Sequence, residues 1–144
     1  MILLDTNIVS EPYRPRPDPN VRAWIDAQPA STLFICTPVL AELRFGYERL
    51  DQGARKNRVR AYVEHVENNL YRDRILSFDS AAAARYAQIA AIRERVGRRM
   101  EQMDALIAAI ALAHGASVAT RDVDDFANLG LEVLNPFESS TSAR

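Results

Sequence analysis

The chain begins Met1-Ile2-Leu3-Leu4-Asp5-Thr6-Asn7, and this stretch indicates the fold class. Four consecutive apolar residues predict a short strand buried on both faces, which is the pattern of a parallel sheet with helices above and below it. Later runs of similar character predict four more strands, at residues 32–36, 74–78, 116–120 and 131–134. The sequence therefore predicts a five-stranded, mostly parallel sheet.

Helical patterns separate these strands. Apolar residues recur at helical spacing, or helix formers dominate, in residues 20–28, 38–50, 54–70, 80–96 and 104–114. We expect Thr37 to cap one of these helices, with Pro38 at its first position, and Asp79 or Ser80 to cap another. Gly115 is expected to end the last one. Alternating strands and helices predict an α/β three-layer sandwich with helices on both faces of the sheet.

Length and composition fit one folded domain. The chain has 144 residues, of which 48% are apolar and 26% charged, so it can bury a core without disulfides. We expect residues 1–137 to form a single domain, with a proline-rich loop at 14–19 and a frayed tail at 138–144. One cysteine, no apolar run of about 20 residues and no basic segment before Asp5 favour a cytoplasmic protein.

Arginine dominates the positive charge. Of 18 Lys and Arg residues against 19 Asp and Glu, only Lys56 is a lysine. The planar guanidinium suits phosphate, although GC-rich coding explains the same bias. The candidates for binding phosphate are Arg14, Arg16, Arg98, Arg99 and Arg121. For the arginines within helices, namely Arg55, Arg58, Arg60, Arg93 and Arg95, we expect a solvated face.

Acidic residues gather where the predicted strands end. Asp5 follows the first strand, Glu42 lies in the helix after the second, Asp104 begins an apolar helix, and Asp122 follows the fourth strand. In a parallel sheet these carboxyl ends meet at one edge, where ligands bind. Carboxylates that converge repel one another unless a cation neutralises them. Oxygen ligands without paired cysteine or histidine select Mg²⁺, or Mn²⁺ in its place, over zinc.

Each of these residues also has a structural interpretation. Asp5 and Asp104 could cap helices, and Asp122 could form a turn. Glu42 could pair with Arg44 or Arg49. Other polar residues have similar alternatives: Asp125 could cap a short helix, His65 is expected to be exposed, and His114 suits a helix C-terminus. These interpretations do not explain why the four acids converge.

Taken in order, four segments resemble the PIN-domain ribonucleases. They are residues 1–7 (MILLDTN), 37–43 (TPVLAEL), 104–109 (DALIAA) and 120–126 (TRDVDDF). More narrowly, the chain resembles the VapC-type toxins of bacterial toxin–antitoxin pairs, including their FitB-like branch. The resemblance extends over nearly the whole chain, and many relatives have asparagine where this chain has Asp122.

The resemblance implies a metal-dependent endoribonuclease. Asp5, Glu42, Asp104 and Asp122 match the family's acidic quartet. Asp5, Asp104 and Asp122 are then metal ligands, while Glu42 positions water. Thr6 and Thr120 match hydroxyl positions that orient the quartet, and Asp125 matches a supporting acidic position. The family also implies an RNA substrate, a homodimer and a small VapB-type antitoxin that blocks the acidic edge and alone contacts operator DNA; residues 38–50 and 54–70 could supply surfaces for this antitoxin.

Other functions are possible for such a site. A receiver domain or a haloacid-dehalogenase-like phosphatase needs a lysine near the site, but the one lysine, Lys56, lies in a helical stretch well before the third strand. The phosphatase also needs an aspartate where Asn7 stands. A flap-type DNA nuclease shares the acid cluster but usually carries long insertions. A non-catalytic PIN-like binding module would not need Asp5, Glu42, Asp104 and Asp122 together.

Overall fold

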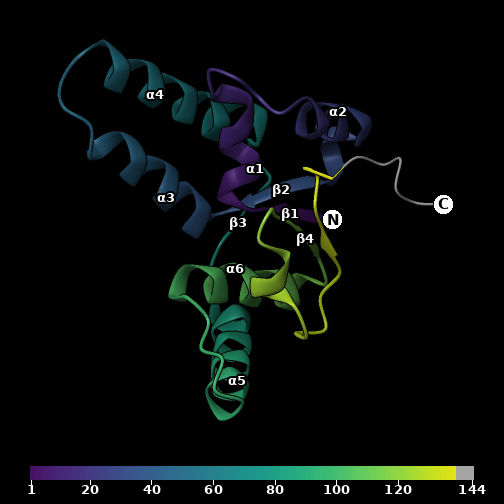
Figure 1. Ribbon diagram of the computed structural model, residues 1–144. Helices are drawn as coiled ribbons and strands as arrows, with labels where there is room; N and C mark the ends of the chain where they lie inside the picture. Colours follow the sequence, from purple (N-terminus) through teal and green to yellow (C-terminus); the bar gives the residue numbers. More distant parts are fainter. Residues whose placement is uncertain (139–144) are drawn as a thin grey trace.

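A computed structural model describes residues 1–138 of the chain (Figure 1). The predicted tail lies, apart from Glu138, outside the described residues. The strands are β1 (Ile2–Leu4), β2 (Leu33–Cys36), β3 (Ile75–Leu76), β4 (Ser117–Ala119) and β5 (Val133–Leu134). Their sheet has the order β3-β2-β1-β4-β5, and every pair of neighbours is parallel. The predicted five-stranded sheet is confirmed, with strands shorter than the apolar runs.

Helices cover both faces of this sheet (Figure 1). The α-helices are α1 (Thr6–Ser10), α2 (Pro19–Ala27), α3 (Thr37–Glu48), α4 (Ala54–His65), α5 (Ser80–Arg95) and α6 (Gln102–His114). Short 3-10 turns are η1 (Glu11–Tyr13), η2 (Ala30–Thr32) and η4 (Val123–Phe126), and the π-helical turn η3 (Val66–Leu70) follows α4. Helices α1 to α4 lie on one side of the sheet and α5 and α6 on the other, with α3 and α4 projecting as a hairpin. This is the three-layer sandwich that the sequence predicted.

The helix ends depart from the sequence-based expectations in several places. Thr37 is the first residue of α3 and not its cap, because Cys36 at the end of β2 takes that position without a side-chain bond. Helix α6 begins at Gln102 with Glu101 as its cap, so Asp104 lies inside the first turn. The predicted helix 54–70 changes to π geometry at Val66.

Other predicted ends are confirmed. Asp79 caps α5 by accepting a hydrogen bond from the Ala82 amide, and Gly115 ends α6 in the left-handed region at φ 64°. Only glycine adopts this conformation without steric cost, so the chain can turn directly from α6 into β4.

The core lies between the sheet and both helical layers. Leu3, Leu4 and Val118 on the central strands are fully buried, as are Ile107 and Ile110 of α6. Burial on both faces explains why β1 reads as a continuous apolar run. Within residues 1–138, no helix has both the length and the apolar character needed to cross a membrane.

Candidate active site

The site lies at the carboxyl ends of β1 and β4, the two central strands. The chain leaves β1 toward β2 on one side and returns through β4 on the other, so the strand order reverses between them. Such a reversal opens a crevice in which α/β proteins bind ligands. The Asp5 amide donates to the Ala119 carbonyl at 2.9 Å, which places Asp5 beside Thr120. Both residues are buried, at 5% and 0% exposure.

Asp5 is held by three neighbours. Its Oδ1 accepts from the Thr6 amide at 2.7 Å, and its Oδ2 accepts from Thr120 Oγ1 at 2.7 Å and from Asn7 Nδ2 at 3.4 Å. Asp5 therefore does cap helix α1, as the structural interpretation predicted, and its carboxylate also lies at the sheet crevice. Burial raises its pKa, the bonds from Thr120 and Thr6 oppose that rise, and the charges of Asp122 and Asp125 add to it.

Glu42 reaches the site from α3 by way of Thr6. Thr6 Oγ1 donates to Glu42 Oε1 at 2.9 Å, and burial together with the charge of Asp5 raises the Glu42 pKa. The expected ion pair with Arg44 is wrong, because Arg44 donates instead to both oxygens of Glu67 at 2.6 Å. Arg49, the other expected partner, lies over the Phe45 ring. Glu42 is thus aligned by a hydroxyl and not by an ion pair with either arginine.

Asp104 projects from the first turn of α6. Burial is the main cause that raises its pKa to about 7, and the charges of Asp5, Asp125, Glu101 and Asp122 raise it further. These interactions place Asp104 within electrostatic range of the other acids. Its position inside α6 removes the interpretation of Asp104 as a helix cap.

Asn7 joins Asp122 to the same group. Its Nδ2 donates to Asp122 Oδ2 at 3.2 Å as well as to Asp5, and its Oδ1 accepts from the Arg121 amide at 3.4 Å. Thr120 Oγ1, which donates to Asp5, also accepts from the Asp122 amide at 3.0 Å. The turn after β4 is therefore tied to β1 by two polar side chains.

Among the residues that the structure describes, no lysine or arginine forms an ion pair with these acids. The six ion pairs among residues 1–138 include none of Asp5, Glu42, Asp104, Asp122 and Asp125. In the same residues, no three acidic, histidine or cysteine side chains stand close enough to form a preformed metal cage. The donor set is oxygen only, the set that Mg²⁺ and Mn²⁺ prefer. The chemistry of these residues therefore fits a hard dication, with an open group of carboxylates instead of a closed cage.

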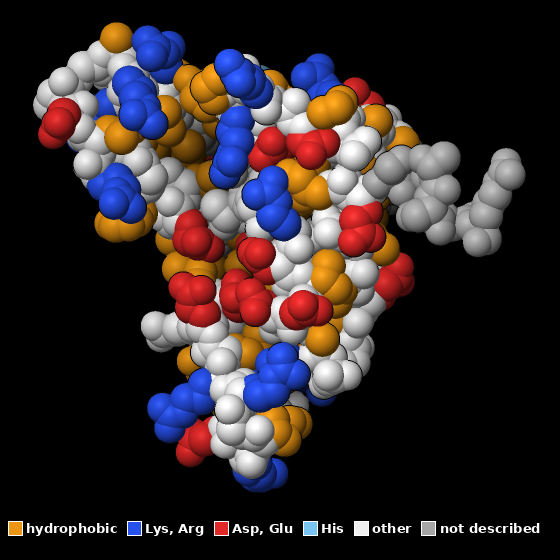
Figure 2. Space-filling view, in the orientation of Figure 1, with side chains coloured by type: hydrophobic (Ala, Val, Ile, Leu, Met, Phe, Trp, Pro, Cys, Tyr) orange, Lys and Arg blue, Asp and Glu red, His pale blue; other side chains and the backbone are white. Residues whose placement is uncertain are grey.

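The basic side chains flank the acids instead of pairing with them. Figure 2 shows Asp and Glu gathered across the middle of one face, with Lys and Arg above them over the α3–α4 hairpin and below them near the α5–α6 connection. Arg98 and Arg99 line a hollow of about 270 Å³ together with Glu101, Asp104 and Asp125. These two predicted arginines thus lie beside the acids.

The other predicted arginines have different surroundings. Arg121 lies 3.8 Å over the Phe137 ring, with Nη2 4.0 Å from Glu11. Arg14 pairs with the same carboxylate at 3.4 Å, and Arg16 is exposed. Glu11 itself is buried and accepts from the Asp18 amide, while its second oxygen has no hydrogen-bond donor.

Sequence reasoning missed four residues here. No sequence pattern assigned a role in the site to Asn7, Glu11 or Glu101. Arg93 was expected on a solvated face but is 8% exposed and donates to the carbonyls of Asp125 and Ala127. That expectation is wrong because α5 packs against α6 and brings Arg93 under the η4 turn. The polar run at residues 5–7 was the only sequence signal that pointed to Asn7.

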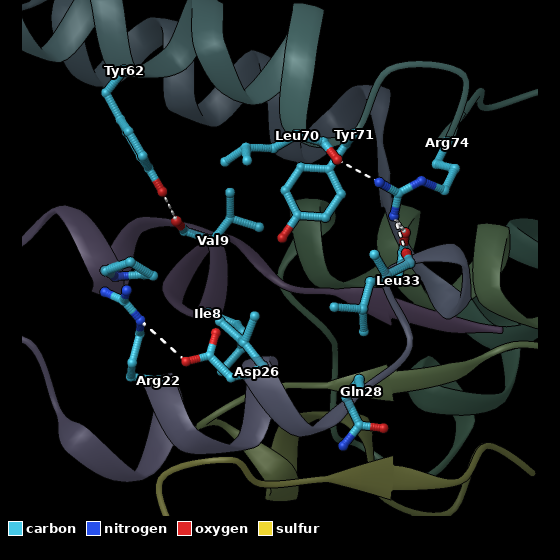
Figure 3. A pocket seen from close by; sticks show the side chains of 13 residues that line it. Ile8, Val9, Arg22, Asp26, Gln28, Leu33, Tyr62, Leu70, Tyr71 and Arg74 are labelled. Atoms are coloured by element: carbon cyan, nitrogen blue, oxygen red, sulfur yellow. Dashed lines mark hydrogen bonds and ion pairs between the residues drawn. The ribbon is translucent and has the colours of Figure 1, made fainter.

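A separate hollow lies on the α2 side of the molecule (Figure 3). Its volume is about 450 Å³, and it is lined mainly by α1, α2 and the segment after α4, with Ile8, Tyr71 and Arg74 among its walls. Arg74 donates to the carbonyls of Ala30, Leu33 and Leu70, which ties β3 to its neighbours. None of the four predicted acids lines this hollow.

The pKa shifts predict how the stability of the metal-free protein depends on pH. The folded-state pKa of Asp104, about 7, and that of Asp5 exceed the ordinary value of 3.8. Protonation therefore favours the folded state, and the free energy of unfolding should fall as pH rises from about 4 to about 7. We expect a lower thermal midpoint at about pH 8 than at about pH 5 in EDTA, and Asp104→Asn to reduce this difference. Thermal unfolding at both pH values measures this difference in midpoint, with the exposed Asp51→Asn as control. If the difference is the same in Asp104→Asn as in the wild type, the prediction is wrong.

The fold and site define the class of protein. The PIN domain family model matches residues 2–131, and the chain belongs to this family. It is 45% identical over 139 residues to the plasmid stability protein StbB of Pseudomonas syringae pv. tomato, covering 96% of this chain and 100% of the relative. It is 41% identical over 138 residues to the VapC ribonuclease Y4jK of Sinorhizobium fredii, covering 96% and 99%.

A solved structure narrows the position within the family. The crystal structure of FitAcB from Neisseria gonorrhoeae superposes with a TM-score of 0.90 at 40% identity, covering 96% of this chain and 100% of the other. The chain thus falls in the VapC/FitB branch, the branch of the VapC ribonuclease and the toxin FitB. The resemblance found in the sequence is confirmed.

Proposed function

We propose that this protein is an endoribonuclease toxin that hydrolyses RNA phosphodiester bonds with Mg²⁺, or Mn²⁺ in its place. The observation that carries the proposal is that Asp5, Asp104, Asp122 and Glu42 lie near one another at the sheet crevice, where no arginine or lysine of residues 1–138 forms an ion pair with them. Relatives named as a VapC ribonuclease and the toxin FitB support the choice of RNA and of toxin.

Each side chain has a distinct part in this chemistry. A bound Mg²⁺ supplies a Lewis acid that activates water and neutralises charge on the phosphate. Asp5, Asp104 and Asp122 would hold the ion, and Thr120 and Asn7 orient Asp5 through hydrogen bonds. Glu42, aligned by Thr6, accepts a proton from the attacking water.

The scissile phosphate needs positive charge as well. Arg98 and Arg99 are exposed beside Asp104, where guanidinium groups can bind the phosphate oxygens of the RNA. Asp125 also lines this hollow, and Arg93 donates to its backbone carbonyl.

A protein partner belongs to the proposal. FitAB has been solved on a DNA fragment, and another similar structure is a member of the VapBC family of toxin-antitoxin systems. We propose that a VapB-type antitoxin holds this chain inactive and that the antitoxin, not this chain, contacts operator DNA. Most of the apolar stripe of α3 is core, since Val39, Leu40 and Leu43 are buried, which leaves Phe45, at 64% exposure, for such a contact. The homodimer stays a prediction that light scattering would test.

The experiment that tests the function is a cleavage panel. Purified protein freed of any partner is incubated with structured RNAs and with single-stranded DNA, in Mg²⁺, in Mn²⁺ and in EDTA. We expect cuts in RNA that require the metal. Cutting of DNA alone would indicate the flap-type alternative, and no cutting by folded protein that also fails to bind Mg²⁺ in calorimetry would indicate a non-catalytic module.

Thr120→Val should weaken both activity and stability. The substitution keeps the volume of the side chain but removes the hydroxyl that donates to Asp5 and accepts from the Asp122 amide. Removing the donor to the buried Asp5 carboxylate costs about 1–3 kcal/mol, and losing the support of a proposed metal ligand lowers activity about 10–100-fold. Thr120→Ser, which keeps the hydroxyl, is the control for both the rate and the midpoint of denaturation. Equal rates in the two variants would show that the hydroxyl does not orient Asp5.

A further inference from the structure

Helices α1 and α3 extend away from the acids, and the side chains that they place toward each other match turn by turn. Thr6 and Glu42, which hydrogen-bond each other, are followed one helical turn later by Ser10 on α1 and Gly46 on α3. Residues four apart lie on one face of a helix, so the surface beyond Glu42 is walled by Ser10 and Gly46. An added Cβ at Gly46 would meet no atom within 4 Å, so there is open space above this glycine.

A hollow continues along this line from the acids to a basic surface. The pocket that contains Thr6 and Glu42 has a volume of about 280 Å³ and shares Ser10, Tyr13, Gly46, Arg55 and Val59 with a second pocket of about 620 Å³. We name the two together the arginine groove, because Arg14, Arg55 and Arg58 line its outer part. Figure 2 shows this Lys- and Arg-rich surface over the α3–α4 hairpin, next to the central acids.

The groove offers the two contacts that bind single-stranded nucleic acid. Arg55 and Arg58 are exposed, lie three residues apart on α4, and pair with no carboxylate within residues 1–138. Tyr13 stacks on Tyr62 with ring centroids 4.6 Å apart, and Tyr62 is anchored by donating its hydroxyl proton to the Val9 carbonyl (Figure 3). Tyr13 is 39% exposed, so a rigid aromatic ring lines the groove beside the arginines.

We propose that the arginine groove binds the unpaired segment of an RNA next to the bond that is cut. Arg55 and Arg58 bind successive phosphates, Tyr13 stacks with a base, and the strand passes over Gly46 to reach the carboxylates. A groove lined by an aromatic ring and by Arg55 and Arg58, which have no ion-pair partner within residues 1–138, favours a polyanion with bases over a polypeptide. That the RNA strand continues from the arginine groove to the carboxylates rests on the proposed ribonuclease function. The binding of RNA in the groove does not.

The first test measures binding without cleavage. The probe is a fluorescent single-stranded RNA of mixed sequence, and its anisotropy is followed with Asp5→Asn protein at several salt concentrations. Adding Arg55→Gln and Arg58→Gln together should weaken binding about tenfold and reduce the salt dependence, log K against log salt, by about 1.4, since each phosphate on a single strand contributes ~0.7. Arg60→Gln removes the same charge per residue from α4 outside the groove and should leave binding unchanged.

The second test blocks the groove at its open side. Both Gly46→Ala and Gly46→Glu should fold, because the space above Gly46 is empty and both residues are better helix formers than glycine. Gly46→Glu places a carboxylate in the path of the phosphates and should weaken RNA binding about tenfold, while Gly46→Ala should not. Circular dichroism confirms that each variant is folded.

The outcomes separate this inference from the proposed function. Wild-type affinity and salt dependence in the double arginine variant, or an equal loss in Arg60→Gln, would overturn the groove. The same substitutions are also made in protein that retains Asp5, and an unchanged KM for RNA with active cleavage would overturn the groove while leaving the ribonuclease intact. Binding that depends on the groove, with no metal-dependent cleavage of any RNA, would overturn the ribonuclease and leave the groove.

Discussion

Asp5→Asn is expected to lower metal-dependent RNA cleavage about a thousandfold, equivalent to about 4 kcal/mol of transition-state stabilisation. Asp5 lies at the centre of the site, where it accepts from Thr120 and Asn7 and raises the pKa of both Glu42 and Asp104. An amide at this position cannot supply the negative charge that holds a dication. The rate of cleavage at saturating Mg²⁺ measures the loss.

The same substitution should leave the folded state intact. Burial disfavours the ionised Asp5, so a neutral side chain of the same size removes an energetic cost. Asparagine is also a good helix cap and can accept from the Thr6 amide as the aspartate does. We therefore expect the thermal midpoint to stay equal or to rise, which separates loss of chemistry from loss of fold.

The charge-matched control is Asp51→Asn on an exposed loop. It should keep both activity and midpoint. Full activity in Asp5→Asn would remove Asp5 from the catalytic site, and a large fall in its midpoint would mean that the ionised carboxylate stabilises the fold. Either result would require the candidate site to be redrawn.

Phe126→Ala should produce the largest loss of stability. Phe126 is 0% exposed at the end of η4, where it packs in the core beneath the turn that begins at Asp122. Removing a buried phenyl ring costs about 3–5 kcal/mol because it loses apolar contacts and leaves a cavity. For a chain of this length we expect the thermal midpoint to fall by about 10 °C or more.

A matched substitution tests whether burial is the cause. Phe45→Ala removes the same ring from α3, where it is 64% exposed, and should change the free energy of unfolding by less than about 0.5 kcal/mol. Chemical denaturation of the two variants measures both values. Similar losses in both would contradict the assignment of Phe126 to the core. Phe126→Ala should also reduce cleavage, because Arg93 holds the carbonyls of Asp125 and Ala127 on either side of the ring.

Much of this protein can be predicted from local pattern. Strands buried on both faces leave continuous apolar runs, so β1 and the other strands were recognisable from residues such as Leu3 and Val118. Parallel strands must bring their carboxyl ends to one edge, so the acids after β1 and β4 could be expected to meet there. Gly115 was recognisable as the end of a helix, because a chain that turns directly after a helix needs a residue with positive φ.

The sequence-based expectations were wrong where the partner of a side chain depends on the tertiary fold. Glu42 has Arg44 close in sequence, yet Arg44 turns to Glu67 on η3 and Glu42 is left for Thr6. The burial of Arg93 likewise depends on the tertiary fold, because it results from the packing of α5 against α6. Helical spacing shows which residues share a face but not which element covers that face.

The sequence alone determined the order of strands and helices and the family, and it led to the prediction of a site at four acids, because these depend on short-range patterns and on composition. Only the tertiary structure decided that Asn7 joins Asp5 to Asp122 and that α1 and α3 wall a groove leading from Glu42 to Arg55. It also decided that Arg98 and Arg99 lie beside the acids, with no ion pair to them among residues 1–138. These features join residues as many as 115 positions apart. Their contacts follow from how the layers pack around the sheet, and no periodicity within a single segment encodes them.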